Sequence, residues 1–316
     1  MTKRGQIPQQ VALALAAAAG CTAAESVGAR ALVIKGAALE EFGLRAHRTS
    51  SDVDLWVDPA RFTSVHEELA RRGWVDRPRW RLSDAMTTHS VSLVHPQWPC
   101  DIDLHQSFPG FLESPQRAFD CIWARRVAVQ RAGITCSVPD RASSAAILAL
   151  HSLRSSPEQH RHVHEYRDLV ALLAAEGDPD FGRELAQVAK QTGSAGSLAP
   201  FLMAIGVDVP TYDATDPAYI AWVTHVNSHN NVTAVFAERW KVASWRERPR
   251  MLALALWPSD DELRLAQPHR TMGPATLMWE RFKRIARSVR SLPLVMSSRR
   301  QARRGVIDSP YTRGDT

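Results

Sequence analysis

The stretch that decides the fold is residues 51–57, which read SDVDLWV. Acidic and apolar side chains alternate along it, as is typical of a β-strand with one buried face. Because residues two apart on a strand point the same way, Asp52 and Asp54 project together while Val53 and Leu55 pack on the core side. Two carboxylates this close repel each other unless a cation lies between them, and Mg²⁺ prefers a few carboxylates supplemented by water and phosphate oxygens. The stretch therefore predicts a half-buried strand that carries a metal site.

A second acidic strand is expected at residues 101–105, which read DIDLH and place Asp101 and Asp103 on one face. If the two strands are neighbours, three or four carboxylates converge. Such a cluster suits two metal ions that hold the attacking and leaving oxygens of a displacement. Either motif alone is more simply explained as a solvent-facing strand, but the two together favour a metal site.

A turn that could hold phosphate lies before the first acidic strand. Residues 31–34 are apolar and predict a buried strand that ends at Lys35-Gly36. A glycine there lets the backbone approach a phosphate, with the amide groups of a helix start facing the anion, and the lysine adds a positive charge. Arg45 and Arg48 precede the acidic strand, where either could reach triphosphate oxygens or be ordinary surface charge.

The rest of the chain divides into a sheet-forming and a helical part. Helices are expected at 9–28, 37–43 and 59–72, the last with Asp58 as N-cap, and further strands at 74–75 and 90–94. From Asp140, a second expected N-cap, the pattern is helical, at 141–153, 163–176, 181–191, 198–204, 216–226, 231–246 and 275–291. We therefore expect an α+β fold, with a mixed-sheet domain over residues 1–139, a helical domain over 140–295 and a flexible basic tail over 296–316.

Charge and cysteine content narrow the functional classes. The chain of 316 residues has a net charge of +6 and a pI near 9.4, which favours contact with phosphate. Its four cysteines have no CxxC spacing, which argues against a zinc site or a redox pair and favours a reducing, cytoplasmic location. Lys3 and Arg4 before an apolar run and Cys21 superficially resemble a lipoprotein signal, but cleavage there would remove most of the first helix. No run is long enough to predict a transmembrane helix, and no nucleic-acid recognition motif is present.

In order along the chain, these motifs resemble the polymerase-β-like nucleotidyltransferase superfamily, and more closely a bacterial family labelled uncharacterised nucleotidyltransferase, whose members occur beside lasso-peptide and other natural-product genes. The resemblance extends over about residues 10–175. The motifs that carry it are Lys35-Gly36-Ala37, Arg48, Ser51-Asp52-Val53-Asp54-Leu55 and Asp101-Ile102-Asp103-Leu104-His105. It departs from the usual pattern at Ala37, where a Gly or Ser is common, and at Ser51, where many relatives carry Gly.

The resemblance implies a fold, an activity and a site. The sheet domain would be catalytic, and the helical domain would bind the acceptor. A nucleoside monophosphate would pass from an NTP, ATP among them, to a hydroxyl or phosphate of a small molecule or peptide, with release of pyrophosphate. Two Mg²⁺ ions, or Mn²⁺, would be held by Asp52, Asp54 and Asp103, with Asp101 as a second choice. Asp103 would also help to remove the acceptor proton. The nucleotide would be bound by Lys35, Gly36, Ala37, Arg48 and Ser51.

Two weaker matches to that family lie in the helical part. His151 and Asp168 fall where relatives carry a His and an Asp on successive helices, although a polar pair that joins the two helices is the simpler interpretation. Pro258-Ser259 matches a Pro-Ser step. The alternating histidines 160, 162 and 164 are expected in a connecting loop rather than in a metal cluster.

Other functions remain open at this point. A glycosyltransferase also uses a DxD pair to bind a metal ion and a sugar nucleotide, and a non-catalytic nucleotide-binding protein could keep the same fold. The basic helix expected over 277–292 could contact a membrane or an acidic partner, or simply pack as the last helix. The tryptophans of the helical part could line an acceptor pocket or fill the core.

Overall fold

The computed structural model describes residues 7–78, 89–155, 159–229, 231–266 and 271–304. Within these ranges the strands form one seven-stranded sheet, in the order β3-β4-β5-β2-β1-β7-β6. The strands are β1 Ala31–Ile34, β2 Asp52–Val57, β3 Val75–Asp76, β4 Ser90–Val94, β5 Asp101–His105, β6 Val127–Arg131 and β7 Ile134–Val138. β2 runs parallel to β5 and β1 runs parallel to β7, whereas the other neighbours are antiparallel. The predicted mixed sheet is confirmed.

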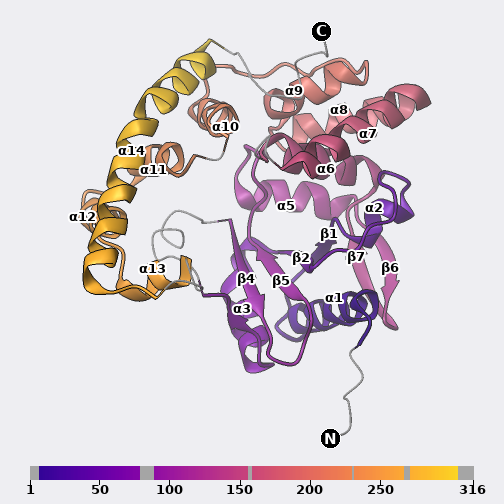
Figure 1. Ribbon diagram of the computed structural model, residues 1–316. Helices are drawn as coiled ribbons and strands as arrows, with labels where there is room; N and C mark the ends of the chain where they lie inside the picture. The colour runs from indigo at the N-terminus through magenta and orange to yellow at the C-terminus, as the bar shows by residue number, and fades with distance from the viewer. Residues whose placement is uncertain (1–6, 79–88, 156–158, 230, 267–270, 305–316) are drawn as a thin grey trace, which may run out of the picture.

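Helices cover both faces of this sheet (Figure 1). α1 (Gln9–Ser26) and α3 (Phe62–Arg71, preceded by a 3-10 turn at Pro59–Arg61) lie on one face, and α5 (Pro115–Ala124) and α6 (Arg141–Leu153) lie on the other. The N-caps predicted for two of these segments are confirmed, because Asp58 accepts a hydrogen bond from the Ala60 N–H and Asp140 accepts one from the Ser143 N–H.

Strand alternation sorts the side chains into two cores. Leu55, with Val53 and Val57, packs in the core beneath α1 and α3. Trp56 of β2 belongs to the opposite core, which it shares with residues of α5, α6 and the helices that follow. Asp52 and Asp54 are an even number of residues from Trp56, so they point toward the same face of the sheet. We call the helices on that face, α5, α6 and those that follow, the helical layer.

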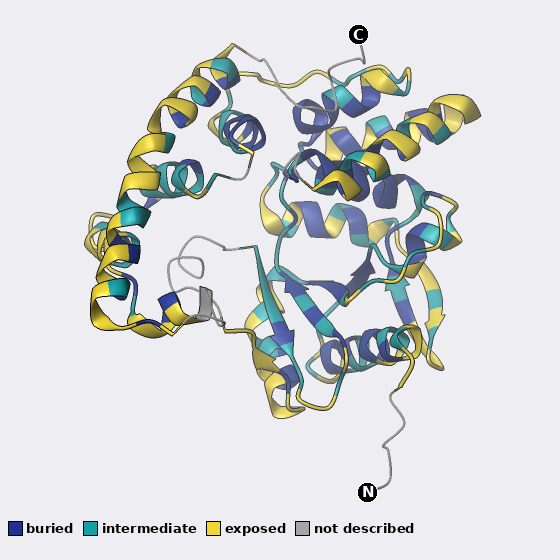
Figure 2. Cartoon of the chain, viewed as in Figure 1, coloured by how far each residue is buried: buried dark blue, intermediate teal, exposed yellow. Residues whose placement is uncertain are grey.

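The second half of the chain is helical, which completes the predicted α+β fold. α2 (Ala37–Glu41) follows β1, and the later helices are α7 His160–Glu176, α8 Pro179–Gln191, α9 Ala195–Ala204, α10 Pro217–Asn227, α11 Val232–Val242, α12 Glu247–Leu256, α13 Asp260–Ala266 and α14 Pro274–Arg303. α6 to α9 stack over the sheet, whereas α14 runs along the outer edge of the molecule and contacts α10 to α13 (Figure 1). Buried residues concentrate in the sheet and in α6, and exposed ones along α14 (Figure 2). No described helix is both long enough and apolar enough to cross a membrane.

The structure differs from the prediction in several places. It contains α5, the β6–β7 hairpin, α12 and α13, which were not predicted. α7 begins at His160, so the histidines expected in a loop lie on a helix. α14 continues through Pro293 to Arg303, so the first part of the expected tail is helical, and residues from 305 onward lie outside the described ranges. Arg, Gln and Ala, which favour helices, make up much of this extension. The domain boundary at 139 falls between β7 and α6 and stays a prediction.

Candidate active site

The pairing of β2 with β5 brings the two acidic motifs together. The strands are parallel, and their register places Asp52 beside Asp101 and Asp54 beside Asp103. We call Asp54 and Asp103 the inner pair, and Asp52 and Asp101 the outer pair. The two strands predicted to be neighbours are therefore neighbours, and all four carboxylates lie on the face that points toward the helical layer.

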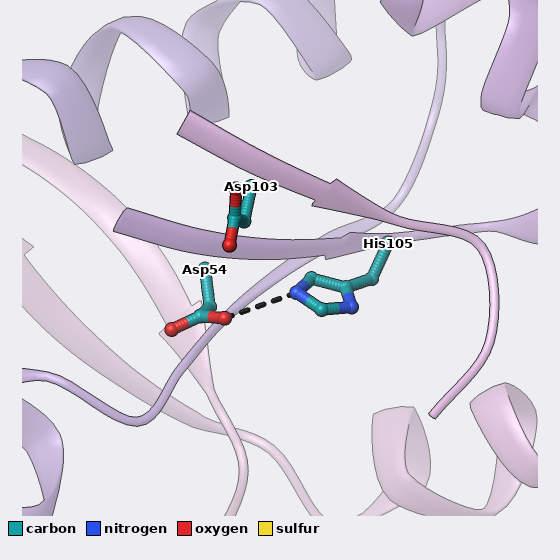
Figure 3. Close-up of side chains that lie close together, drawn as sticks. All are labelled: Asp54, Asp103 and His105. Atoms are coloured by element: carbon teal, nitrogen blue, oxygen red, sulfur yellow. Dashed lines mark hydrogen bonds and ion pairs between the residues drawn. The ribbon is translucent and has the colours of Figure 1, made fainter. Parts of the chain in front are cut away.

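The inner pair lies in a polar cluster in which Asp54 and His105 are buried and Asp103 is half-buried. Asp54 is buried, and its Oδ1 lies 2.7 Å from the Lys35 Nζ and 3.0 Å from the His105 Nε2. Because an ionised carboxylate can only accept, the imidazole donates this hydrogen bond. Figure 3 shows Asp54 and Asp103 side by side on their strands, with His105 turned toward Asp54. Potential ligand atoms of these three residues all lie within 4.8 Å of one another.

The pKa values of the two carboxyls of the inner pair are shifted in opposite directions. Burial raises the pKa of Asp54, but the Lys35 ammonium and the His105 hydrogen bond outweigh it and hold that pKa below its usual range. Burial also raises the pKa of Asp103, and the nearby charges of Asp54 and Asp52 raise it further. A second carboxylate beside an ionised one is costly unless positive charge enters the cluster.

The outer pair is more open. Asp52 is half-buried and accepts a hydrogen bond of 2.7 Å from the Ser50 Oγ. Asp101 forms an ion pair with Arg77, whose side chain is exposed. Ser51, predicted to contact nucleotide, is exposed at the start of β2, and its carbonyl accepts the Asp101 N–H. Asp52 is not part of the three-residue cluster, so its role as a metal ligand stays a prediction.

The Lys35-Gly36 turn joins β1 to α2 beside the inner pair. Both residues have positive φ, 62° at Lys35 and 55° at Gly36, and the Gly36 ψ of −138° is a conformation that side chains disfavour. A Cβ at Gly36 would meet no atom within 4 Å, so glycine is needed for the backbone and not for space. Ala37 is exposed at the first position of α2. This turn aims the Lys35 side chain at Asp54.

Arg48 is held by a residue of α7. Its Nη1 lies 2.6 Å from the Glu165 Oε1, and the Nη1 of Arg45 lies 3.3 Å from the same oxygen. The His162 Nδ1 lies 3.2 Å from the other carboxylate oxygen. Burial raises the pKa of Glu165, but the His162 hydrogen bond and the two guanidinium charges lower it overall. The predicted nucleotide-binding arginine is therefore anchored to the helical layer by an ionised carboxylate.

His151 contacts a residue other than the expected one. Its ring packs edge-on against the His162 ring, with centroids 4.8 Å apart, whereas Asp168 is exposed. The prediction that His151 and Asp168 form a polar pair is therefore wrong, because Asp168 lies on the solvent side of α7. Burial holds the pKa of His151 well below its usual value, and the charges of Lys35 and Arg154 lower it further.

Sequence reasoning assigned no role to three residues around the inner pair. His105 and Glu165 are described above, and Arg154 caps the C-terminal end of α6. Burial lowers the pKa of Arg154, and the charges of Asp54 and Asp103 oppose this, which places the guanidinium in the field of the inner pair. DIDLH offered a local signal for His105, which lies two residues from Asp103 on the same strand face. Nothing local to Glu165 or Arg154 indicates the site, since Glu165 is linked to it through Arg48 and Arg154 comes from the end of α6.

The inner pair and His105 together offer ligand atoms that fit a divalent cation. Two carboxylates and an imidazole suit Mn²⁺ and, through the carboxylates, Mg²⁺. The raised pKa of Asp103 and the Lys35 ammonium at Asp54 both indicate that the cluster needs positive charge.

Comparison with known proteins gives one family. The model of a family described as "Uncharacterised nucleotidyltransferase" matches residues 9–205, from the start of α1 to the end of α9. A search of curated proteins finds no match. Among solved structures, an antigenic nucleotidyltransferase-like protein from Paracoccidioides brasiliensis is similar over 65% of this chain and 96% of its own, with 11% identity and a TM-score of 0.36. That likeness carries no argument.

Proposed function

The chain belongs to the family of uncharacterised nucleotidyltransferases, and from this membership we propose a reaction for it. A nucleoside monophosphate passes from an NTP to a hydroxyl or phosphate of a small molecule or peptide. An acceptor oxygen attacks the α-phosphorus, the bond to the bridging oxygen of the β-phosphate breaks, and pyrophosphate leaves with the electron pair. The observation that supports this best is the inner pair, two carboxylates from neighbouring strands surrounded by the cationic groups of Lys35 and Arg154.

The inner pair would hold the divalent cation, with His105 as a third donor and Asp52 as the ligand that the resemblance implies. When bound, Mg²⁺ or Mn²⁺ would neutralise charge on the triphosphate and on the attacking oxygen. Asp103 would accept the acceptor proton. Without the cation, burial and the Asp54 charge raise the pKa of Asp103, and a bound cation would lower it.

Lys35 would have two successive partners. Its ammonium neutralises Asp54 at 2.7 Å while no divalent cation is there. Once a divalent cation binds Asp54 in its place, the Lys35 ammonium could instead bind phosphate oxygens of the nucleotide. Metal and nucleotide binding would then be coupled through one side chain, because each favours the release of Lys35 from Asp54.

Backbone and guanidinium groups would hold the rest of the triphosphate. The N–H groups at the start of α2, near Gly36 and Ala37, have no side-chain cap. Arg48 presents a guanidinium that Glu165 fixes at 2.6 Å, and Arg154 adds a second from the end of α6. These positive groups would position the polyphosphate and stabilise its negative charge. Positioning and charge stabilisation are the main sources of catalysis in phosphoryl transfer.

Radiolabelled nucleotides test the proposal. The full chain is incubated with Mg²⁺ or Mn²⁺ and each α-labelled NTP, with candidate hydroxyl and phosphate acceptors, and pyrophosphate and labelled products are measured. Metal-dependent pyrophosphate release with label on the acceptor supports the proposal. Turnover of sugar nucleotides alone would show a glycosyltransferase instead.

Binding without turnover needs a separate measurement. NTP is titrated with and without Mg²⁺ against the wild type and against Asp54→Asn with Asp103→Asn. A non-catalytic nucleotide-binding protein would bind NTP equally well in both proteins and release no pyrophosphate. We expect the double variant to lose the metal-dependent part of the affinity.

A further inference from the structure

The last helix, α14, has two apolar faces. The inner one carries Leu277, Val295 and Ala302, which are buried. It packs toward α10 and α11, where the Ser291 Oγ donates to the Thr233 Oγ1 at 2.8 Å. This face accounts for how the helix is attached to the molecule, and it needs no partner.

The outer face is apolar and exposed. Phe282, Val289 and Met296 are 56%, 58% and 57% exposed, and their spacing of seven residues puts them on one side of the helix. Met278 and Leu292 lie on the same stripe by helical spacing, and both are exposed. We call these five residues the outer stripe. The buried Leu277 and Val295 lie on another side of the helix, and α14, whose residues are mostly exposed, runs along the outer edge of the molecule (Figures 1 and 2).

Positive charge borders the outer stripe. By helical spacing, Arg300 and Arg303 continue the line of the stripe beyond Met296, whereas Lys283, Arg287 and Arg290 form a row on another side of the helix. Arg299, Arg300 and Arg303 follow at the C-terminal end of the helix. Glu280 is the one acidic residue in the sequence of α14, and its Oε1 is 3.0 Å from the Lys283 Nζ. The helix therefore combines an exposed apolar stripe with a strong excess of cations, and the cations at its C-terminal end lie in line with the stripe.

We propose that the outer stripe of α14 rests on an anionic membrane surface, with the helix parallel to the bilayer. Apolar side chains that enter the headgroup region, flanked by Lys and Arg that meet anionic lipid, are the features of helices that bind in this way. The exposed Trp279 beside the stripe fits the same zone. The family match ends at residue 205, so this surface lies outside the part of the chain assigned to the transferase family.

Charge argues against the other occupants of this face. Two copies of the chain that met through α14 would bring their basic borders together, which costs free energy. An acidic protein would satisfy the cations. However, a stripe about five helical turns long, with cations in line with it at one end, suits an extended anionic surface better than a compact partner.

Vesicle co-sedimentation of the full chain tests the proposal. We expect binding to vesicles rich in phosphatidylserine, weak binding to vesicles of phosphatidylcholine alone, and loss of binding at high salt. Phe282→Asp with Val289→Asp should weaken binding about tenfold or more, because two acidic groups replace the apolar contact. Arg300→Glu with Arg303→Glu, which reverses the charges in line with the stripe, should weaken binding to the anionic vesicles alone. Met203→Asp, which places the same charge at an exposed residue of α9, is the matched control and should bind as the wild type does.

Three results would overturn the proposal. The first is failure of the wild type, shown by circular dichroism and gel filtration to be folded and monomeric, to bind anionic vesicles. The second is wild-type binding by the Phe282→Asp, Val289→Asp variant. The third is a dimer, or binding to polyglutamate in place of vesicles, that this variant abolishes. None of these depends on nucleotide turnover, so they are independent of the proposed function.

Discussion

The inner and outer pairs are neighbouring positions on the same two strands, with the same residue type at all four places, yet their surroundings differ. Asp54, which is buried, and Asp103, which is half-buried, lie close to the cationic groups of Lys35 and Arg154 and to His105. Asp52 and Asp101 face Ser50 and Arg77 in a more open position. The repeated DxD pattern can thus be recognised from adjacent residues. The charges and hydrogen bonds that act on each carboxylate come mostly from residues elsewhere in the sequence. The comparison teaches that identical motifs on one ladder need not carry equal function.

Removing a carboxylate of the inner pair should have the largest effect. Asp54→Asn or Asp103→Asn each removes a carboxylate that we propose as a metal ligand, so we expect turnover to fall on the order of a thousandfold. Asp101→Asn, the matched change in the outer pair, should reduce turnover about threefold at most, since its ion pair is exposed. Pyrophosphate release measures all three. Equal losses at Asp101 and Asp103 would end the distinction between the pairs.

Asp52→Asn should have the next largest effect. The resemblance makes Asp52 a metal ligand, whereas the structure bonds it to Ser50 and leaves it outside the three-residue cluster. We expect a loss on the order of a hundredfold in turnover, with a higher metal concentration needed for half-maximal activity. The metal titration is the sharper measurement. A change within threefold would assign Asp52 to structure and leave the inner pair with His105 as the complete set of ligands.

Lys35→Met should separate the two tasks proposed for this lysine. Loss of the ammonium removes a phosphate contact, so we expect kcat/KM for NTP to fall about tenfold or more. The same change removes the cation that neutralises Asp54, so Mn²⁺ should bind the nucleotide-free variant about tenfold more tightly. Calorimetry or the electron paramagnetic resonance of free Mn²⁺ measures this without turnover. Weaker Mn²⁺ binding would refute the exchange of partners at Lys35.

Glu165→Ala should have a moderate effect that falls on nucleotide binding. The carboxylate fixes Arg48 and does not itself face the inner pair, so we expect KM for NTP to rise about tenfold with a smaller change in kcat. Glu165→Asp, which keeps the charge, should restore part of the loss. A fall in kcat with KM unchanged would mean that Glu165 acts on the reaction and not through Arg48.

The smallest effect concerns stability and pH. Because burial holds the pKa of His151 below that of an unfolded histidine, the unfolded chain binds more protons between the two values. The free energy of unfolding should therefore decrease as pH falls below about 6.5, the ordinary value for histidine. His151→Gln should flatten this dependence, which thermal melts between neutral and mildly acidic pH would show as a loss of a few degrees in the wild type alone. If the melting temperatures of the wild type and the variant changed equally with pH, a group other than His151 would be responsible for the pH dependence.

The strands of the site could be predicted because their alternation is local. DVDLWV and DIDLH were assigned to the correct residues, and so was their common face. The β6–β7 hairpin was missed although Ala132 and Gly133, both with positive φ, mark its turn. Its strands are largely exposed, so they lack the apolar alternation that identified the others.

The contacts that surround the acidic strands could not be predicted, because they join distant parts of the chain. Glu165 meets Arg48 across more than a hundred residues, and His105 meets Asp54 across 51. The histidines at the start of α7 were assigned to a loop because the stretch is polar. The structure buries His162 against His151 in a contact that no local pattern reports.

The core shared by the sheet and the helices has a consequence for synthesis. Leu32, Ile34 and Trp56 pack with Leu150 and Phe201, so one face of β1 and β2 is covered by helices made much later. During translation, at about 5–20 residues per second, that face waits several seconds or more without its cover. A nascent chain halted near residue 139 would present it to the cytosol, and we expect such chains to be bound by chaperones until α6 to α9 emerge.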